Sequence, residues 1–183
     1  MIKKFSVLGI GNAMVDILIE ADEEFLYRHK ISKGVMQLVD LQKAQSLYNN
    51  FGTALEVSGG SGANTIFGLA SLGVATSYIG KVKDDALGQK YEEGLKKEKV
   101  EYFYSKKKEE LPTGTCLILV TPDSERTMCT FLGTAGKINE NDVSSDAIKK
   151  SEIIFLEGYL WDEGEPKKAF DKAIKIANKV AMS

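Results

Sequence analysis

The sequence predicts an α/β fold built around a largely parallel sheet. Up to Leu111, short β-prone runs alternate with runs of helical periodicity, which is typical of parallel strands joined by crossover helices. A glycine-rich stretch, residues 56–65 (EVSGGSGANT), joins one such strand to one such helix. After residue 115 the alternation stops, and two β-prone runs flank a turn at residues 122–125, which predicts a hairpin.

The individual elements follow from local patterns. Strands are expected where branched and aromatic residues form short runs, and helices where apolar residues recur every three or four positions after a capping residue. The predicted strands are residues 5–11, 15–20, 34–40, 54–57, 75–79, 100–104, 115–121, 126–131 and 151–156. The predicted helices are residues 23–29, 41–50, a helix directly after the glycine-rich turn, 86–97, one or two short acidic helices within 139–150, and 165–180.

The glycine-rich stretch is the first candidate binding element. Its small residues let the backbone approach a ligand closely. The helix that follows directs free N–H groups back at the turn, which favours oxygen-rich or anionic ligands. Asn64 lies in the first turn of that helix, where its amide can both donate and accept. The same pattern also fits a tight strand-to-helix connection without a ligand, and the glycines alone do not separate the two interpretations.

The first predicted strand is followed by a second candidate residue. Gly9 and Gly11 resemble the start of a dinucleotide fingerprint, but Met14 takes the third glycine position and residues 15–20 look extended, so a nicotinamide-binding domain is not supported. Asp16 lies just past this strand, at the edge where open α/β sheets bind ligands. Its carboxylate could accept hydrogen bonds from sugar hydroxyls, although a turn aspartate facing water would look the same.

Composition excludes several classes of function. With 24 basic and 26 acidic residues the net charge is −2, which gives no argument for a nucleic-acid partner or an acidic membrane surface. No apolar run is long enough to span a membrane, and we expect a cytoplasmic protein. One histidine and two cysteines do not make a metal site. We expect both thiols to be free, with Cys116 opposite Phe131 and Cys129 opposite Ile118 on the hairpin.

Five stretches, in this order along the chain, resemble the ribokinase-like (PfkB) family of sugar and nucleoside kinases. They are residues 11–16 (GNAMVD), 59–65 (GGSGANT), 72–73 with 79–88 (LG, IGKVKDDALG), 112–116 (PTGTC) and 125–127 (ERT). The first and fourth are most similar to the adenosine kinase branch. The resemblance implies a doubly wound α/β sandwich with a small β-sheet lid. Residues 1–183 would be the N-terminal portion of one such domain, with lid strands near 16–20, 35–40 and 115–131.

The resemblance also implies a site. In the family the substrate lies between lid and sheet, so Asp16 would hold ribose hydroxyls, Gly60 would pack its backbone against the sugar, and Asn64 would bond a hydroxyl. Arg126 would hold the lid or meet phosphate. The implied substrate-binding residues are Asn12, Asp16, Gly59, Gly60, Asn64 and Arg126. The implied partner is a small nucleoside or sugar, and the protein would be a monomer or a lid-mediated homodimer.

One part of the family pattern has no counterpart. The glycine-rich anion hole that carries the family's catalytic aspartate does not occur in these 183 residues, so no catalytic residue is assigned. The final apolar helix should lead into another strand, so we expect the polypeptide to be incomplete. We expect the substrate-binding half of a kinase that uses ATP and Mg²⁺ to phosphorylate the primary hydroxyl of an adenosine-like nucleoside or a sugar, inactive by itself. The alternative is a non-catalytic nucleoside- or sugar-binding module.

Overall fold

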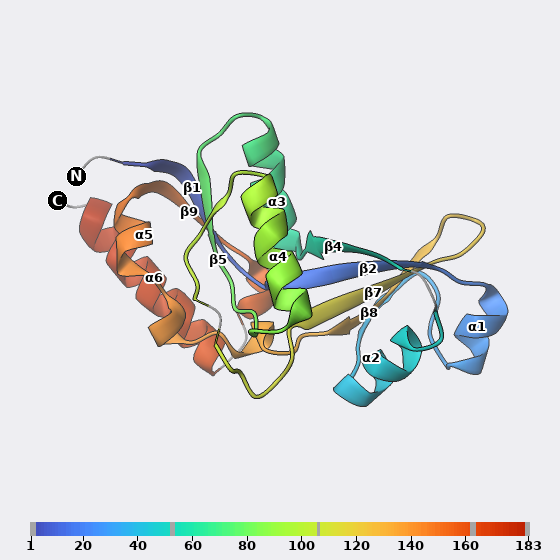
Figure 1. Ribbon diagram of the computed structural model, residues 1–183. Helices are drawn as coiled ribbons and strands as arrows, with labels where there is room; N and C mark the ends of the chain where they lie inside the picture. Colours follow the sequence, from blue (N-terminus) through green and yellow to red (C-terminus); the bar gives the residue numbers. More distant parts are fainter. Residues whose placement is uncertain (1–2, 52–53, 106, 162–163, 182–183) are drawn as a thin grey trace.

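A computed structural model describes residues 3–51, 54–105, 107–161 and 164–181; the first two and last two residues of the expected domain lie outside these ranges. Within them the chain forms two sheets (Figure 1). The first has four parallel strands in the order β6-β5-β1-β9. Their bounds are Phe5–Ile10 for β1, Thr76–Ile79 for β5, Glu101–Tyr102 for β6 and Ser151–Leu156 for β9. The predicted α/β fold with a parallel sheet is confirmed.

Helices cover both faces of the first sheet, as a doubly wound fold requires (Figure 1). On one face α3 and α4 pack through Ile66, Tyr91 and Leu95. On the other face α5 and α6 pack through Ile148 and Phe170. The helices are α1 Glu23–Arg28, α2 Leu41–Tyr48, α3 Ser61–Ser71, α4 Ala86–Lys97, α5 Ser145–Lys149 and α6 Glu165–Ala181, and the 3-10 turns are η1 Ala135–Lys137, η2 Glu140–Asp142 and η3 Gly158–Leu160.

The second sheet extends away from the first, and α1 and α2 pack against one of its faces (Figure 1). Within the described residues its strand order is β3-β8-β7-β2-β4, with parallel β2–β7 and β3–β8 pairs and antiparallel β2–β4 and β7–β8 pairs. The strands are β2 Met14–Glu20, β3 Met36–Leu38, β4 Leu55–Gly59, β7 Gly114–Val120 and β8 Arg126–Phe131. The ranges expected for the lid all contribute, and β4 joins them, which the sequence did not indicate.

Two predicted strands, both at sheet edges, are shorter than expected. Of residues 34–40, only Met36–Leu38 pair with β8, and Asp40 instead caps α2 by accepting from the Lys43 backbone N–H. Of residues 100–104, only Glu101–Tyr102 pair with β5. Gly34 has φ of 75°, outside the extended region, and Asp40 belongs to the helix cap, so β3 is confined between them.

Asp85 links the two sheets. It caps α4 by accepting from the Gly88 backbone N–H, as its place before the helix predicts. Its carboxylate also accepts from the Thr113 backbone N–H at 3.0 Å and from the Thr113 hydroxyl at 2.7 Å. Thr113 directly precedes β7, so the Asp85 side chain fixes the start of β7 against the start of α4.

The predicted hairpin forms, but its register is one residue away from the prediction. Cys116 pairs with Thr130, not Phe131, and Leu117 pairs with Cys129. Since successive side chains alternate between the faces of a strand, the two thiols lie on opposite faces of the sheet and both are free. The absence of a disulfide was therefore predicted correctly from the wrong register. No helix in the described residues is long and apolar enough to cross a membrane.

Both thiols should react slowly with thiol reagents in the folded chain. Burial raises the pKa of Cys116 to about 11 and also raises the pKa of Cys129. A two-unit rise lowers the thiolate fraction at a given pH by about 100-fold, and the thiolate is the reacting form. A thiol reagent should find two thiols per chain in unreduced, denatured protein and react far more slowly with native protein. A denatured, unreduced sample in which neither thiol titrates would contradict the placement on opposite faces.

Candidate functional site

The candidate site lies at the carboxyl ends of β1 and β9. In the first sheet β5 and β9 flank β1 on opposite sides, so the chain crosses over in two directions from β1. Open α/β sheets bind ligands in the crevice at such a switch point. Gly11 and Asn12 follow β1, Glu157 follows β9, and the second sheet begins at Met14. The N-terminus of α3 faces the same place, because Ser61 and Gly62 contact Glu157.

A buried carboxylate holds this crevice together. Glu157 is only 4% exposed. It accepts from the Asn12 backbone N–H at 2.5 Å, from the Gly62 backbone N–H at 2.8 Å and from the Ser61 hydroxyl. Its own N–H donates to the Ile10 carbonyl at 3.0 Å. The carboxylate therefore joins the ends of β1 and β9 to the first turn of α3, where the helix dipole stabilises negative charge.

Glycines give the carboxylate room. A Cβ on Gly11 would lie 2.7 Å from Glu157 Oε2, and one on Gly62 would lie 3.2 Å from Glu157 Cβ. Gly60, the N-cap of α3, has φ of 93°, a conformation that favours glycine, and a Cβ there would overlap the Asn12 carbonyl oxygen. The glycines of this stretch therefore first of all allow close contact with other groups of the chain itself.

Asp16 meets the glycine-rich stretch from the second sheet. It lies on β2, whose residue Met14 pairs with Gly59 at the end of β4. A Cβ on Gly59 would overlap the Asp16 carboxylate, so only glycine fits beside it. Burial raises the pKa of Asp16, while the Asn64 side chain and the Gly60 backbone favour the charged form and limit that rise. The structure therefore brings four predicted residues together: a carboxylate, an amide and two glycines.

Asn12 adjoins this group. Its carbonyl oxygen lies against Gly60 and accepts from the Tyr78 hydroxyl at 3.2 Å. Its side-chain oxygen Oδ1 is buried and accepts no hydrogen bond within the described part of the chain. Buried polar atoms in native proteins are almost always paired, so this oxygen is an acceptor suited to a ligand hydroxyl or amine.

Arg126 lies apart from Asp16, Asn64, Gly59 and Gly60. It is exposed at the start of β8, where it pairs with Val120, and Val120 in turn pairs with Glu20. Asp16 pairs with Cys116, four positions earlier on the same strands. At about 3.3 Å per residue these four positions amount to roughly 13 Å. The geometry therefore gives no support for Arg126 in the same pocket.

Glu157 is the residue that the sequence analysis missed. A carboxylate directly after an apolar strand was the available signal, and Asp16 had been selected on the same ground. The hydrogen bond from the Gly62 N–H to Glu157 also changes the expectation that the N-terminus of α3 is free to bind an anionic ligand. The attraction of this helix N-terminus for negative charge is already met, in part, by a group of the chain itself.

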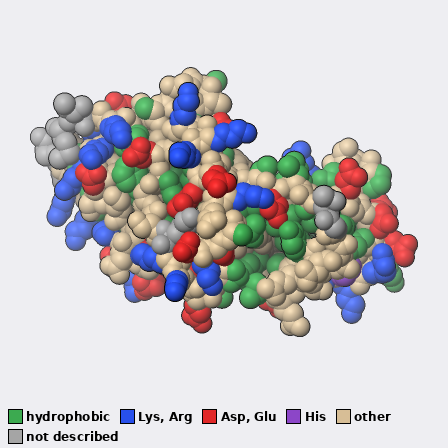
Figure 2. Space-filling view, viewed as in Figure 1, with side chains coloured by type: hydrophobic (Ala, Val, Ile, Leu, Met, Phe, Trp, Pro, Cys, Tyr) green, Lys and Arg blue, Asp and Glu red, His purple; other side chains and the backbone are tan. Residues whose placement is uncertain are grey.

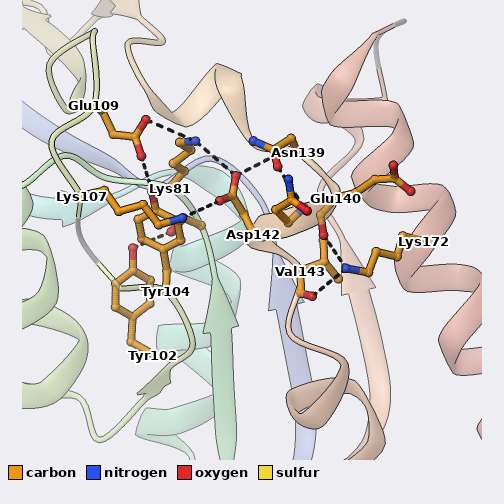
Figure 3. Close-up of polar contacts among 12 residues, drawn as sticks. Lys81, Tyr102, Tyr104, Lys107, Glu109, Asn139, Glu140, Asp142, Val143 and Lys172 are labelled. Atoms are coloured by element: carbon orange, nitrogen blue, oxygen red, sulfur yellow. Dashed lines mark hydrogen bonds and ion pairs between the residues drawn. The ribbon is translucent and has the colours of Figure 1, made fainter.

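A second charged cluster lies near the end of β5 (Figure 3). Lys81 is 6% exposed, and its ammonium lies 3.3 Å from both Glu109 Oε2 and Asp142 Oδ2. Lys107 lies 3.5 Å from Asp142 Oδ1, and the Tyr104 hydroxyl donates to Glu109 at 2.7 Å. Among the described residues two positive and two negative charges meet here, and their ion pairs link the loops around the cluster.

Comparison with known proteins identifies a family match. The model of the pfkB family carbohydrate kinases matches residues 31–182. A 5-dehydro-2-deoxygluconokinase of Clostridium perfringens is 31% identical over 180 residues, which are 97% of this chain and 47% of that protein. The chain therefore spans about half the length of the curated relatives it matches.

Two solved structures of kinases are similar in fold to this chain. The adenosine kinase from Sinorhizobium meliloti superposes with a TM-score of 0.89 at 40% identity, over 97% of this chain and 54% of that one. A probable sugar kinase protein from Rhizobium etli CFN 42 gives a TM-score of 0.89 at 37% identity, over 98% of this chain and 54% of that one. These are ribokinase-like folds, so the fold expected from the sequence is confirmed.

The role of Glu157 can be tested by an isosteric change. Glu157→Gln replaces one accepting oxygen by an NH₂ group that faces backbone N–H donors. Leaving buried donors without an acceptor should lower the free energy of unfolding by about 1–3 kcal/mol. Urea denaturation followed by circular dichroism measures it. The matched control is Glu152→Gln, an exposed position on β9, which should change stability by less than about 0.5 kcal/mol. Equal effects of the two changes would contradict the proposed linkage.

Proposed function

Because the chain belongs to the pfkB family of carbohydrate kinases, we propose that it is the substrate-binding half of an ATP-dependent kinase that phosphorylates the primary hydroxyl of a nucleoside or sugar. The observation that carries this proposal is the convergence of Asp16, Asn64, Gly59 and Gly60 at the crevice between the two sheets. In this proposal the second sheet is the lid over the substrate.

The chemistry of these groups suits a polyol. An ionised carboxylate can accept from two vicinal hydroxyls, and such charge-assisted bonds are worth roughly 1.5–3 kcal/mol each. The Asn64 amide can donate to one hydroxyl and accept from another. The close approach of Gly59 and Gly60 leaves the backbone beside the ligand, where orientation can be fixed without side chains. Together these groups bind and orient the sugar, and none of them is proposed as the catalytic base.

An adenosine-like nucleoside is the preferred substrate in this proposal. The support is the 40% identity to the adenosine kinase from Sinorhizobium meliloti, beside the resemblance of residues 11–16 and 112–116. A sugar is the alternative, supported by the 37% identity to the probable sugar kinase from Rhizobium etli CFN 42.

The gathered residues supply groups for the sugar, and none of them is assigned to the nucleotide cofactor. Among the described residues no group of three or more His, Cys, Asp or Glu side chains could hold a metal ion. Lys81, which is buried, is already paired with two carboxylates. We therefore assign ATP and Mg²⁺ to the complete enzyme only, and no step of the reaction is derived through them.

The second sheet also bears on assembly. Its edge strands carry exposed apolar side chains, Met36 and Leu38 on β3 and Leu55 and Val57 on β4. Exposed edges with apolar side chains favour pairing with another chain. This supports a lid-mediated homodimer as the alternative to a monomer, and sedimentation of the purified chain distinguishes the two.

The 183-residue chain should bind a nucleoside without phosphorylating it. General acid–base catalysis is commonly worth about 10² to 10⁴-fold, and stabilisation of the transferring phosphoryl group adds to that. Incubation with ATP, Mg²⁺ and adenosine should therefore give no more product than a control without protein. ATP-dependent phosphorylation well above that control would contradict the assignment of a substrate-binding half. The mass of the native polypeptide then separates part of a kinase from a short, non-catalytic binding module.

Asp16→Asn should weaken adenosine binding by about 10 to 100-fold, because a charged acceptor of two hydroxyls is lost. Isothermal titration calorimetry measures the affinity. The control is Asp84→Asn, an exposed carboxylate before α4, which should bind like the wild type. Wild-type affinity in folded Asp16→Asn would show that Asp16 does not hold the hydroxyls.

The pH dependence of stability and of binding should distinguish a hydroxyl-binding role of Asp16 from a structural role. Because the pKa of Asp16 in the folded chain is raised, its charge opposes folding: the penalty is absent below the unfolded pKa, grows as pH rises from the unfolded to the folded pKa, and persists above it. Asp16→Asn should therefore unfold at the same or a higher temperature at neutral pH. Wild-type binding should weaken as pH falls through the raised pKa, while binding by the variant should not follow that titration.

A further inference from the structure

A cavity lies on the face of the second sheet opposite to Asp16. On β2 and β7 the side chains of Asp16 and Cys116 share one face, and those of Ile17 and Leu117 share the other. The cavity has a volume of about 390 Å³. Its apolar walls come from the second sheet, from α2 and from the start of α4. The main contributors are Ile17, Leu41, Ala44, Leu87, Leu117 and Phe131.

The cavity opens on the surface between α4 and α2. Figure 2 shows hydrophobic side chains gathered at this place, in a hollow between the two helices. Its volume falls in the range of small-molecule sites, which are mostly apolar with a few polar groups. None of Asn12, Asp16, Gly59, Gly60 and Asn64 lines it, so the proposed substrate site does not account for it.

The charged and amide groups of the lining come from α2, β4 and α4, and the hydroxyl side chains of Thr113 and Thr115 come from the start of β7. The Glu56 carboxylate accepts from the Tyr48 hydroxyl at 2.7 Å and is paired with the Lys90 ammonium through its other oxygen. The pKa of Glu56 is lowered, chiefly by Lys90, so at neutral pH the two are a charged pair with no net charge. The side-chain amides of Gln45 and Asn49, which also line the cavity, are exposed to water.

We propose that this cavity binds an uncharged aromatic heterocycle. A charged ligand would lose hydration against the apolar walls without a net opposite charge to meet it, because Glu56 and Lys90 neutralise each other. An aliphatic ligand would displace water from the exposed Gln45 and Asn49 amides without replacing its hydrogen bonds. A heteroaromatic ring presents an apolar face to Leu117 and Phe131 and donors and acceptors at its edge.

The walls belong to separate elements. Ile17 and Leu117 lie on β2 and β7, whereas Leu87 lies on α4, which packs against β4 and β2 of the second sheet as well as against β6 of the first. A ligand in contact with both walls therefore fixes β2 and β7 of the second sheet against α4. The opposite face of that sheet carries Asp16, so occupancy of the cavity should change the affinity for the substrate. This last consequence rests on the proposed function.

Benzimidazole is a suitable probe, since it is bicyclic, uncharged at neutral pH, and carries one donor and one acceptor. A ligand of this size reaches a Kd of about 0.01 to 10 mM. Methyl NMR spectra of the 183-residue chain should show saturable shifts at Ile17 and Leu117. The methyl groups of Met14 and Ile118, on the opposite face, should shift less. Shifts confined to Met14 and Ile118, or no saturable shift up to about 10 mM, would overturn the proposal.

Variants at exposed positions of α4 and α2 provide the matched comparison. Ala86 lines the cavity and is exposed, so Ala86→Phe fills the space without disturbing the core. It should weaken benzimidazole binding at least tenfold. Gln89→Phe adds the same ring at an exposed position outside the cavity and should leave the affinity unchanged. Gln45→Leu keeps the apolar walls, removes one amide and should weaken binding several-fold. Equal affinity of wild type and folded Ala86→Phe would overturn the site.

The coupling between the cavity and the proposed substrate site is measured separately, through the affinity for adenosine. Adenosine affinity should differ with and without saturating benzimidazole in the wild type, and should not differ in Ala86→Phe. Benzimidazole binding without any change in adenosine affinity would overturn the coupling and leave the cavity assignment standing. If the chain does not bind adenosine at all, the proposed function fails, while the methyl shifts at Ile17 and Leu117 still decide the cavity site by themselves.

Discussion

The buried carboxylate of Glu157 is the constraint on which the crevice depends. It accepts from the Asn12 and Gly62 backbone N–H groups and the Ser61 hydroxyl, donors that come from the loop after β1 and from the start of α3. An unpaired buried donor costs about 1–3 kcal/mol, so these segments are stable together and unfavourable apart. Gly11 is required by the same contact, because a side chain there would collide with the carboxylate.

The position of the second sheet follows from this constraint. β2 starts two residues after Asn12, and β4 ends at Gly59, directly before the N-cap of α3. Both strands are therefore tied to the first sheet at the end where Asp16 and Asn64 meet. Asp85 provides a second link by holding Thr113, which precedes β7. A sheet fixed at one end can present Asp16 on one face and leave a cavity behind the other.

The local features were accessible from the sequence. The strand and helix patterns, the Asp85 cap and the hairpin depend on residues near each other in the chain, and each is present. So does the turn before α3, where the fold requires glycine at Gly60. The resemblance to known kinases added the ribokinase-like architecture with its lid, and it supported Asp16 and Asn64, which the structure brings together.

What only the tertiary structure decided concerns pairs that are far apart in sequence. The partners of Glu157 precede it by about a hundred residues and more, and no local pattern specifies which donors a buried carboxylate will meet. The addition of β4 to the second sheet, the one-residue shift at Cys116 and the separation of Arg126 from Asp16 all depend on strand register. Register is set by the packing of whole faces, because a shift of one residue exchanges the buried and exposed sides of a strand. Composition and periodicity determine that a strand forms, and only the assembled sheets determine what lies opposite each side chain.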